Sequence, residues 1–209
     1  MNTHDSLQWR YAAKKLIADK QVPEEDLEYI LQAGNLSATS YGLQPFSIIV
    51  VTDEETKLEL LKHAYNQVQV SENSHLIVLA AATNVDEEYI SEYTSRMERE
   101  RGLESGALDG FKKVMVGDLT NRSQEERITW SQKQAYIALG SMMIAAGEKE
   151  VDGCPMEGFS NDEFDRILGL SEMNLRSTAL FPIGYRSPED ESQNYKKVRK
   201  GLEDLVEYK

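Results

Sequence analysis

The chain has 209 residues, of which 40% are apolar and 28% are charged, a composition typical of one folded domain spanning residues 1–209. Its formal net charge of -13 argues against a nucleic-acid partner, because phosphate contacts need a basic surface. It has one cysteine, a polar N-terminus and no apolar run near the roughly 20 residues of a membrane helix, so we expect a cytoplasmic protein without disulfides or membrane contact.

Before residue 85, helical and extended patterns alternate. A helix is predicted from Pro23 to Gly34, because proline suits the first helical position and glycine a left-handed cap. Residues 46–51 are rich in β-branched side chains and predict a strand. Residues 76–82 are apolar throughout, which is typical of a strand covered on both faces. Asp53 should cap a helix between the strands, with these residues on its inner side: Leu58, Leu61 and Tyr65.

After residue 85 the chain is predicted to be mainly helical. Residues 86–104 indicate a solvated helix with a narrow buried stripe, and the glycines between 102 and 110 then indicate a mobile segment. The longest helix is expected over about 124–146 and is apolar almost all round. Its many small residues fit a core helix and a dimer interface equally well.

The last third of the chain predicts a short helix, a strand and a charged tail. Ser160 and Glu163 have the spacing of a capping box for a helix that ends at Gly169. Residues 179–183 are expected to form a last strand. Residues 185–209 carry many charges and too little apolar content to fold alone.

Several common catalytic signatures are absent. The chain has no G-x-G-x-x-G, Walker or G-x-S-x-G motif, which argues against a Rossmann nucleotide site, a nucleoside-triphosphate site and a serine hydrolase. His4, His63 and His75 are isolated, so no metal site is indicated. Cys154 lies beside a proline, and we interpret it as a packing residue rather than a nucleophile.

Two basic clusters lie at opposite ends of this acidic chain. Arg10 and Lys14 are one helical turn apart, and Lys197 and Arg199 stand in a basic stretch of the tail. The arginine fork suits phosphate, and lysine supplies a mobile point charge. Taken singly, each cluster is more typical of a solvated surface.

Together with three loops of small, hydroxyl and amide residues, these clusters resemble the nitroreductase family of flavoproteins. The loops are Ser37–Pro45, Asn66–Gln69 and Cys154–Gly158. The resemblance implies an α+β fold with a central mixed sheet surrounded by helices, FMN at the interface of a homodimer, and a C-terminal extension, residues 185–209, along that dimer.

The resemblance also implies the site residues. The cofactor-binding residues are Arg10, Tyr11, Ala12, Lys14, Ser37, Ala38, Thr39, Ser40, Asn66, Gln69, Pro155, Met156, Glu157, Gly158, Lys197 and Arg199. Arg10 would hold the FMN phosphate together with the tail cations, and Lys14 would lie at the N1–C2 edge of the flavin ring. Residues 37–40 would come from the partner subunit. The backbone N–H groups of residues 155–158 would face N5 and O4.

Three departures from the family pattern concern flavin binding and redox tuning. The serine that often follows the arginine is replaced by Tyr11, Ala12 and Ala13, which removes a neutral hydrogen bond of roughly 0.5–1.5 kcal/mol. The usual Ala-Pro-Ser-Ser loop has lost its proline but keeps both hydroxyl groups. Gln69 stands where some relatives have lysine, so Lys14 is the main cation expected at the pyrimidine edge.

The function implied is an FMN-dependent oxidoreductase that passes hydride from NADH or NADPH through flavin N5 to nitroaromatics, quinones or similar flat acceptors in a ping-pong cycle. No catalytic side chain is assigned, and Phe111 is a candidate substrate contact. One alternative is a specialised branch that performs reductive dehalogenation or consumes flavin. The other is a flavin-binding module without turnover.

Overall fold

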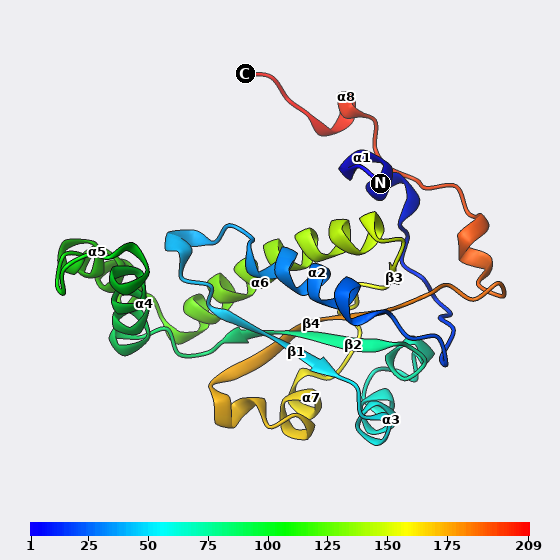
Figure 1. Ribbon diagram of the computed structural model, residues 1–209, viewed down its shortest axis with the longest axis horizontal. Coiled ribbons are helices and arrows are strands. Elements are labelled where there is room, and N and C mark those ends of the chain that lie inside the picture. The colour runs from blue at the N-terminus through cyan, green and yellow to red at the C-terminus, as the bar shows by residue number, and fades with distance from the viewer.

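The computed structural model describes residues 1–209 and is built around a four-stranded sheet of order β1-β2-β4-β3 (Figure 1). The strands are β1 (Phe46–Val51), β2 (His75–Ala82), β3 (Asp152–Gly153) and β4 (Leu175–Gly184). Both strands predicted in the first half are confirmed, and the last strand begins at Leu175 rather than 179. All strand pairs are antiparallel, so the predicted mixed sheet is wrong; the parallel contact is an isolated bridge between Ala12 and Gly153. Composition does not determine strand direction, which depends on how the connections return.

The chain has eight α-helices, some of which cover the sheet. They are α1 (Thr3–Trp9), α2 (Glu24–Asn35), α3 (Glu54–Lys62), α4 (Glu87–Arg101), α5 (Asp109–Leu119), α6 (Gln124–Glu148), α7 (Asn161–Ile167) and α8 (Leu202–Leu205). In Figure 1, α2 and α6 cover one face of the sheet, and α3 and α7 cover the other. The α+β prediction is confirmed.

The central strand β2 is covered on both faces, as its apolar run predicts. Ile77 and Leu79 pack with residues of α2 and α6, whereas Leu76 and Val78 pack with residues of α3 and α7. Successive side chains of a strand point to opposite faces, so an apolar residue is needed at every position.

The longest helix, α6, begins with a capping box between Ser123 and Glu126. Its buried face carries Leu139 and Met142 in the main core, but Tyr136 and Ile137 are 39% and 47% exposed on the opposite side. The helix is therefore apolar on a core face and on a solvent face of the single chain.

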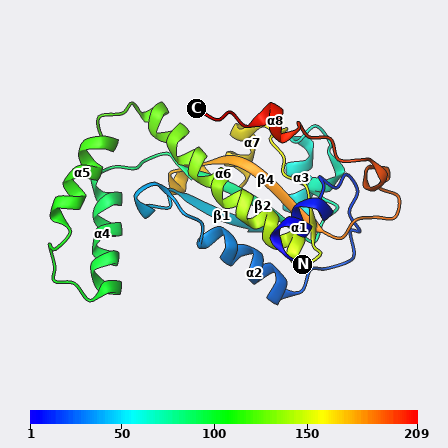
Figure 2. The same ribbon diagram turned by 90° about the horizontal axis from the view of Figure 1, so that it is seen from above.

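Helices α4 and α5 form a lobe that projects from the body (Figure 2). Gly102 ends α4 in the left-handed conformation, with φ 62°, but Gly110 already lies inside α5. The loop between α4 and α5 is therefore shorter than the mobile segment predicted between residues 102 and 110. Met115 and Leu119 of α5 are fully buried against α4 and the start of α6, and this long-range burial outweighs the low helix propensity of glycine.

Two helix-end predictions fail for reasons of packing and hydrogen bonding. Gly34 lies inside α2, where an added Cβ would be 2.9 Å from Sδ of Met142, so this glycine permits close approach of α2 to α6 rather than capping. Ser160 precedes α7 but forms no capping box, because the carboxylate of Glu163 binds Arg166 instead. This helix was predicted to end at Gly169; α7 ends at Ile167, and Gly169 follows in the left-handed conformation with φ 65°.

The Asp53 cap of α3 is confirmed, since its side chain accepts the N–H of Thr56. The inner face of α3 was predicted only in part: Leu61 is partly buried against the core, but Leu58 and Tyr65 are not. Leu60 is the fully buried leucine, whereas Leu58 and Tyr65 are 55% and 79% exposed. The helix ends at Lys62, so Tyr65 does not continue its periodicity.

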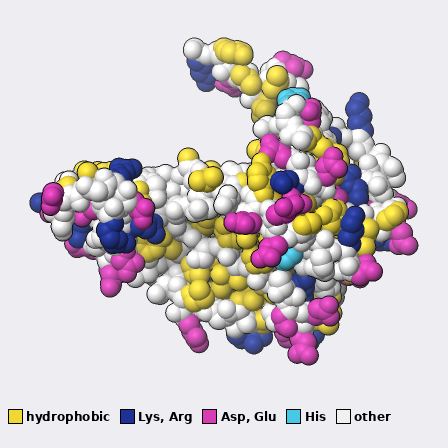
Figure 3. Space-filling view, in the orientation of Figure 1, with side chains coloured by type: hydrophobic (Ala, Val, Ile, Leu, Met, Phe, Trp, Pro, Cys, Tyr) yellow, Lys and Arg dark blue, Asp and Glu magenta, His cyan; other side chains and the backbone are white.

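The tail runs beside α1 and then leaves the body (Figures 1 and 2). Its apolar side chains at Leu202, Leu205 and Tyr208 are 74%, 66% and 95% exposed, and Figure 3 shows apolar atoms on this projection. They have nothing to bury against within one chain. Among the helices, none combines the length and apolar content needed to cross a bilayer.

Candidate functional site

The N-terminal segment that carries Arg10 and Lys14 is extended rather than helical. Helix α1 ends at Trp9, and Arg10 has an extended backbone. The following residues run beside the sheet, where Ala12 bridges to Gly153 and Leu16 bridges to Arg186. The expected helical face with both cations was therefore wrong, because strand-like pairing holds this segment.

The tail brings two cations to Arg10. Nζ of Lys197 donates to the carbonyl oxygens of Leu7, Gln8 and Arg10 at 2.6, 3.1 and 2.5 Å, and so caps the C-terminal end of α1. Burial and the neighbouring Arg199 lower the pKa of Arg10. The pKa of Lys197 is lowered by burial and by both arginines. The two ends of the sequence thus meet in one basic cluster, as the motif order predicted.

This cluster has no internal counter-charge. Arg10, Lys197 and Arg199 form no ion pair with a carboxylate of the chain. Arg10 and Lys197 also line a cavity of about 330 Å³ together with Trp9 and Tyr195. Cations held together without an acid are suited to contact an anion.

Lys14 and Gln69 approach each other around Cys154. The Lys14 Nζ and the Gln69 Nε2 each lie 3.8 Å from the Cys154 Sγ. Cys154 and Gln69 are 1% and 4% exposed. A thiol is a weak acceptor, so this contact leaves most of the hydrogen-bonding capacity of the cation and the amide unused.

Two buried carboxylates that the sequence did not single out hold the N-terminal segment in place. Asp190, 2% exposed, accepts hydrogen bonds from the Tyr11 hydroxyl at 2.9 Å and the Lys14 N–H at 2.7 Å. Burial alone would raise the pKa of Asp190, but these hydrogen bonds hold it below its usual value. Asp152 binds the Arg186 guanidinium, whose centre lies 4.2 Å from the Trp9 ring. The Gly-Tyr-Arg motif at 184–186 was the available sequence signal for Arg186.

The loop 155–158 exposes two backbone donors rather than a row of them. Met156 exchanges both backbone hydrogen bonds with Leu180 of β4, each at 2.9 Å, and Pro155 has no N–H. The prediction that every N–H of this loop faces a ligand is therefore wrong for these two residues. The N–H groups of Glu157 and Gly158 have no acceptor in the chain. The neighbouring Asn66 is exposed and left-handed, with φ 53°.

The remaining predicted site residues lie elsewhere in the single chain. The loop 37–40 packs on the middle of α6, where the Ser37 hydroxyl donates to the Ser141 hydroxyl at 2.7 Å and the Ser40 N–H donates to Gln134 at 2.8 Å. Phe111 contacts Tyr41 edge-on in the α4–α5 lobe, with ring centres 6.1 Å apart. In Figure 1 this lobe and the basic cluster are at opposite ends of the molecule. One chain does not bring these groups together.

Comparison with known proteins decides the family. The model of the family described as "Nitroreductase family" matches residues 7–185 of this chain. This chain belongs to the nitroreductase family. The Bacillus subtilis protein "Putative NAD(P)H nitroreductase YfkO" is 33% identical over 215 residues, covering 98% of this chain and 96% of that protein. "Putative NAD(P)H nitroreductase SH0546" from Staphylococcus haemolyticus is 31% identical over 214 residues, covering 98% and 95%.

Solved structures share the nitroreductase fold with this chain. The ydfN protein of Bacillus subtilis superposes with a TM-score of 0.88 at 20% identity, covering 99% of this chain and 98% of that one. A nitroreductase-type protein from Exiguobacterium sibiricum, solved in complex with FMN, has a TM-score of 0.85 at 20% identity, covering 100% and 98%. At this identity the likeness establishes the fold.

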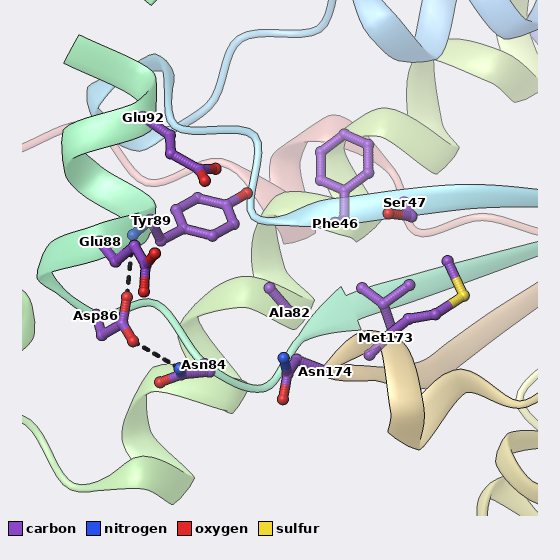
Figure 4. Close-up of a pocket in the computed structure, with 11 residues that line it drawn as sticks. Phe46, Ser47, Ala82, Asn84, Asp86, Glu88, Tyr89, Glu92, Met173 and Asn174 are labelled. Carbon is purple, nitrogen blue, oxygen red and sulfur yellow. Dashed lines mark hydrogen bonds between the residues drawn. The ribbon is translucent and has the colours of Figure 1, made fainter. Parts of the chain in front are cut away.

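A second cavity of this nitroreductase-family chain, about 270 Å³, lies at the root of α4 (Figure 4). It is lined by Asp86, Glu88 and Glu92 and by no lysine or arginine. Asp86 caps α4, accepting the Tyr89 N–H at 2.9 Å and the Asn84 side-chain amide at 2.7 Å, as the dashed lines show. An anionic cofactor would be repelled here.

Proposed function

We propose that this chain is an FMN-dependent NAD(P)H oxidoreductase that passes hydride to small flat acceptors such as nitroaromatics or quinones. The observation that carries the proposal is the basic cluster of Arg10, Lys197 and Arg199, assembled from both ends of the chain without an acid partner. Membership of the nitroreductase family and the FMN complex of the Exiguobacterium sibiricum protein support the same cofactor.

The residues present fit FMN in charge and in donor type. Arg10 supplies a planar fork for the phosphate, and the tail supplies the other two cations. Lys14 and Gln69 supply a cation and an amide donor side by side. Ala12 offers no hydroxyl, so the cations carry the phosphate binding.

Bound FMN supplies N5, the atom that accepts and returns hydride. The N–H groups of Glu157 and Gly158, which have no acceptor in the chain, would orient the N5–O4 edge by donating hydrogen bonds to it. Lys14 would lie at the N1–C2 edge and stabilise the negative charge that two-electron reduction places there. Neither role requires a side chain that gives or takes a proton.

We also propose that the functional unit is a homodimer. In this arrangement loop 37–40 and Phe111 reach the basic cluster of the partner subunit, which explains why one chain leaves them apart. The exposed apolar residues Tyr136 and Ile137 on α6, and the apolar side chains of the tail, supply surface for this contact. Sedimentation at micromolar concentration should give twice the chain mass of 23.7 kDa.

One experiment tests the cofactor and the reaction together. Protein reconstituted with FMN is titrated anaerobically with NADH and with NADPH while the flavin absorbance is followed. The proposal expects bleaching by at least one nucleotide, recovery on adding a quinone or nitroaromatic, and parallel steady-state lines. A protein that remains colourless after addition of FMN overturns the proposal. Bound flavin that neither nucleotide reduces indicates the non-catalytic flavin-binding module.

A second assay addresses the acceptor. Broad turnover of unrelated quinones and nitro compounds supports the general reductase. Reduction of the flavin without such turnover favours the specialised branch, with dehalogenation or flavin consumption as its reaction.

A further inference from the structure

The two unpaired N–H groups at Glu157 and Gly158 are flanked by backbone groups that form hydrogen bonds within the chain. Met156 is fixed to Leu180 of β4 through both its N–H and its carbonyl oxygen. The Glu157 carbonyl accepts the Phe159 N–H at 3.0 Å, and the Gly158 carbonyl accepts the Gln67 side-chain amide at 2.7 Å. The backbone on either side of the two donors is therefore anchored.

The side chain of Glu157 is anchored as well, to a different element. The Tyr136 hydroxyl, on α6, donates to the Glu157 Oε1 at 2.6 Å. Burial, and then this hydrogen bond, raise the pKa of Tyr136 well above its usual value, so the hydroxyl remains a donor throughout the neutral range. This contact ties the loop to the long helix.

We propose that Tyr136 is a positioning residue for the flavin site: by holding the Glu157 side chain on α6, it aims the N–H groups of Glu157 and Gly158 at the N5–O4 edge. The inference rests on the proposed function, which supplies the flavin. A hydrogen bond weakens steeply when its donor is misaligned, so even a small displacement of this anchored loop would weaken its contact with N5.

Three variants separate the tether from the charge. Tyr136→Phe removes the donor and keeps the ring. Glu157→Ala removes both tether and charge, whereas Glu157→Gln removes the charge and keeps a side-chain oxygen that Tyr136 can bond. If the tether matters, Glu157→Gln resembles the wild type, and the other two variants resemble each other.

The chain offers a matched control. The Tyr29 hydroxyl donates to Glu148 at 2.9 Å, a tyrosine–glutamate pair between α2 and α6 that is remote from the loop. Tyr29→Phe removes the same chemical group and should leave every flavin property unchanged.

The experiment uses full-length protein loaded with FMN. FMN affinity is measured by fluorescence quenching, the flavin midpoint potential by equilibration with a reference dye, and the rate of flavin reduction by anaerobic stopped flow. Loss of one well-aligned hydrogen bond corresponds to up to about tenfold in rate. We expect Tyr136→Phe and Glu157→Ala to slow flavin reduction by up to about tenfold and to lower the potential, with FMN affinity within about threefold of the wild type.

The outcomes are distinguishable. Tyr136→Phe with wild-type potential and rate, or Glu157→Gln behaving as Glu157→Ala, overturns the positioning role while leaving the proposed function intact. If neither nucleotide reduces the FMN bound to the wild-type protein, the proposed function is overturned. The flavin midpoint potential of Tyr136→Phe, compared with that of the wild type, still decides the inference. Wild-type protein that does not bind FMN overturns both.

Discussion

Acidic residues have different roles at the two ends of the sheet: at one end they support a segment that carries cations, and at the other they line a cavity. At the end formed by Asp152, Gly184 and the tail, the buried carboxylates hold the segment that bears Arg10 and Lys14. The cations of the basic cluster have no carboxylate partner, and Lys197 donates to carbonyl oxygens. At the end formed by Phe46, Ala82 and Leu175, every charged residue that lines the cavity is an acid. A net charge of -13 is therefore compatible with a local cluster of cations that have no acid partner, because local pairing decides which charges are available.

The largest expected effect comes from removing the tail cations. Lys197→Ala with Arg199→Ala should weaken FMN binding at least about tenfold, since a charge-assisted hydrogen bond from Arg199 is worth roughly 1.5–3 kcal/mol. Lys197 adds its positive charge, because its three ammonium hydrogens already donate to carbonyl oxygens. Isothermal titration with FMN measures the loss. Lys197 also caps α1, so the single variant Arg199→Ala shows how much of the effect is direct. Unchanged affinity in the double variant would make the cluster an ordinary surface patch.

The next largest effect should be a change of the flavin midpoint potential in variants of Lys14 and Gln69. Lys14→Ala should lower the flavin midpoint potential by roughly 30 mV or more, because about 1.4 kcal/mol corresponds to 30 mV for a two-electron couple. Gln69→Lys should raise the potential, since it adds a second cation where Gln69 now lies beside Cys154. Dye equilibration measures both. A shift of the same sign in the two variants would contradict placement of these residues at the pyrimidine edge.

Asp190 predicts a pH-dependent stability difference. Its pKa in the folded state is below the ordinary value, so its contribution is fully present above the ordinary carboxyl pKa and is lost as pH falls through the lowered value. Asp190→Asn should lower the free energy of unfolding by about 1–3 kcal/mol at pH 7, because buried N–H donors lose a charged acceptor. Urea unfolding at pH 7 and under acid conditions checks this. A gap between variant and wild type that widens in acid would show that the sign is wrong.

The acidic cavity should give the smallest effect. Glu88→Gln with Glu92→Gln should leave FMN affinity unchanged and stability within about 0.5 kcal/mol, as expected for surface substitutions. Asp86→Ala should cost about 1 kcal/mol, because Asp86 caps α4. Thermal unfolding and FMN titration test both. Weaker FMN binding in the double variant would mean that this cavity takes part in the flavin site.

Much of the fold was predictable because its signals are local. The strands at 46–51 and 76–82, the cap at Asp53 and the long helix α6 all follow from periodicity or from contacts a few residues apart. Helix α5 was missed because its glycines suggest a loop, and only burial of Met115 and Leu119 against distant elements outweighs that preference.

The sequence by itself determined which kinds of groups the site contains: arginine and lysine at both ends of the chain, and a loop able to offer backbone donors. Only the tertiary structure decided which of these groups are available. Pairing with Leu180 occupies the N–H of Met156, whereas the N–H groups of Glu157 and Gly158 stay without an acceptor in the chain. Asp190 accepts the backbone N–H of Lys14, so the ammonium group of Lys14 remains available. The physical reason is that hydrogen bonding is satisfied by whichever partner the fold brings near, and the partners here lie 24 and 176 residues apart in the chain.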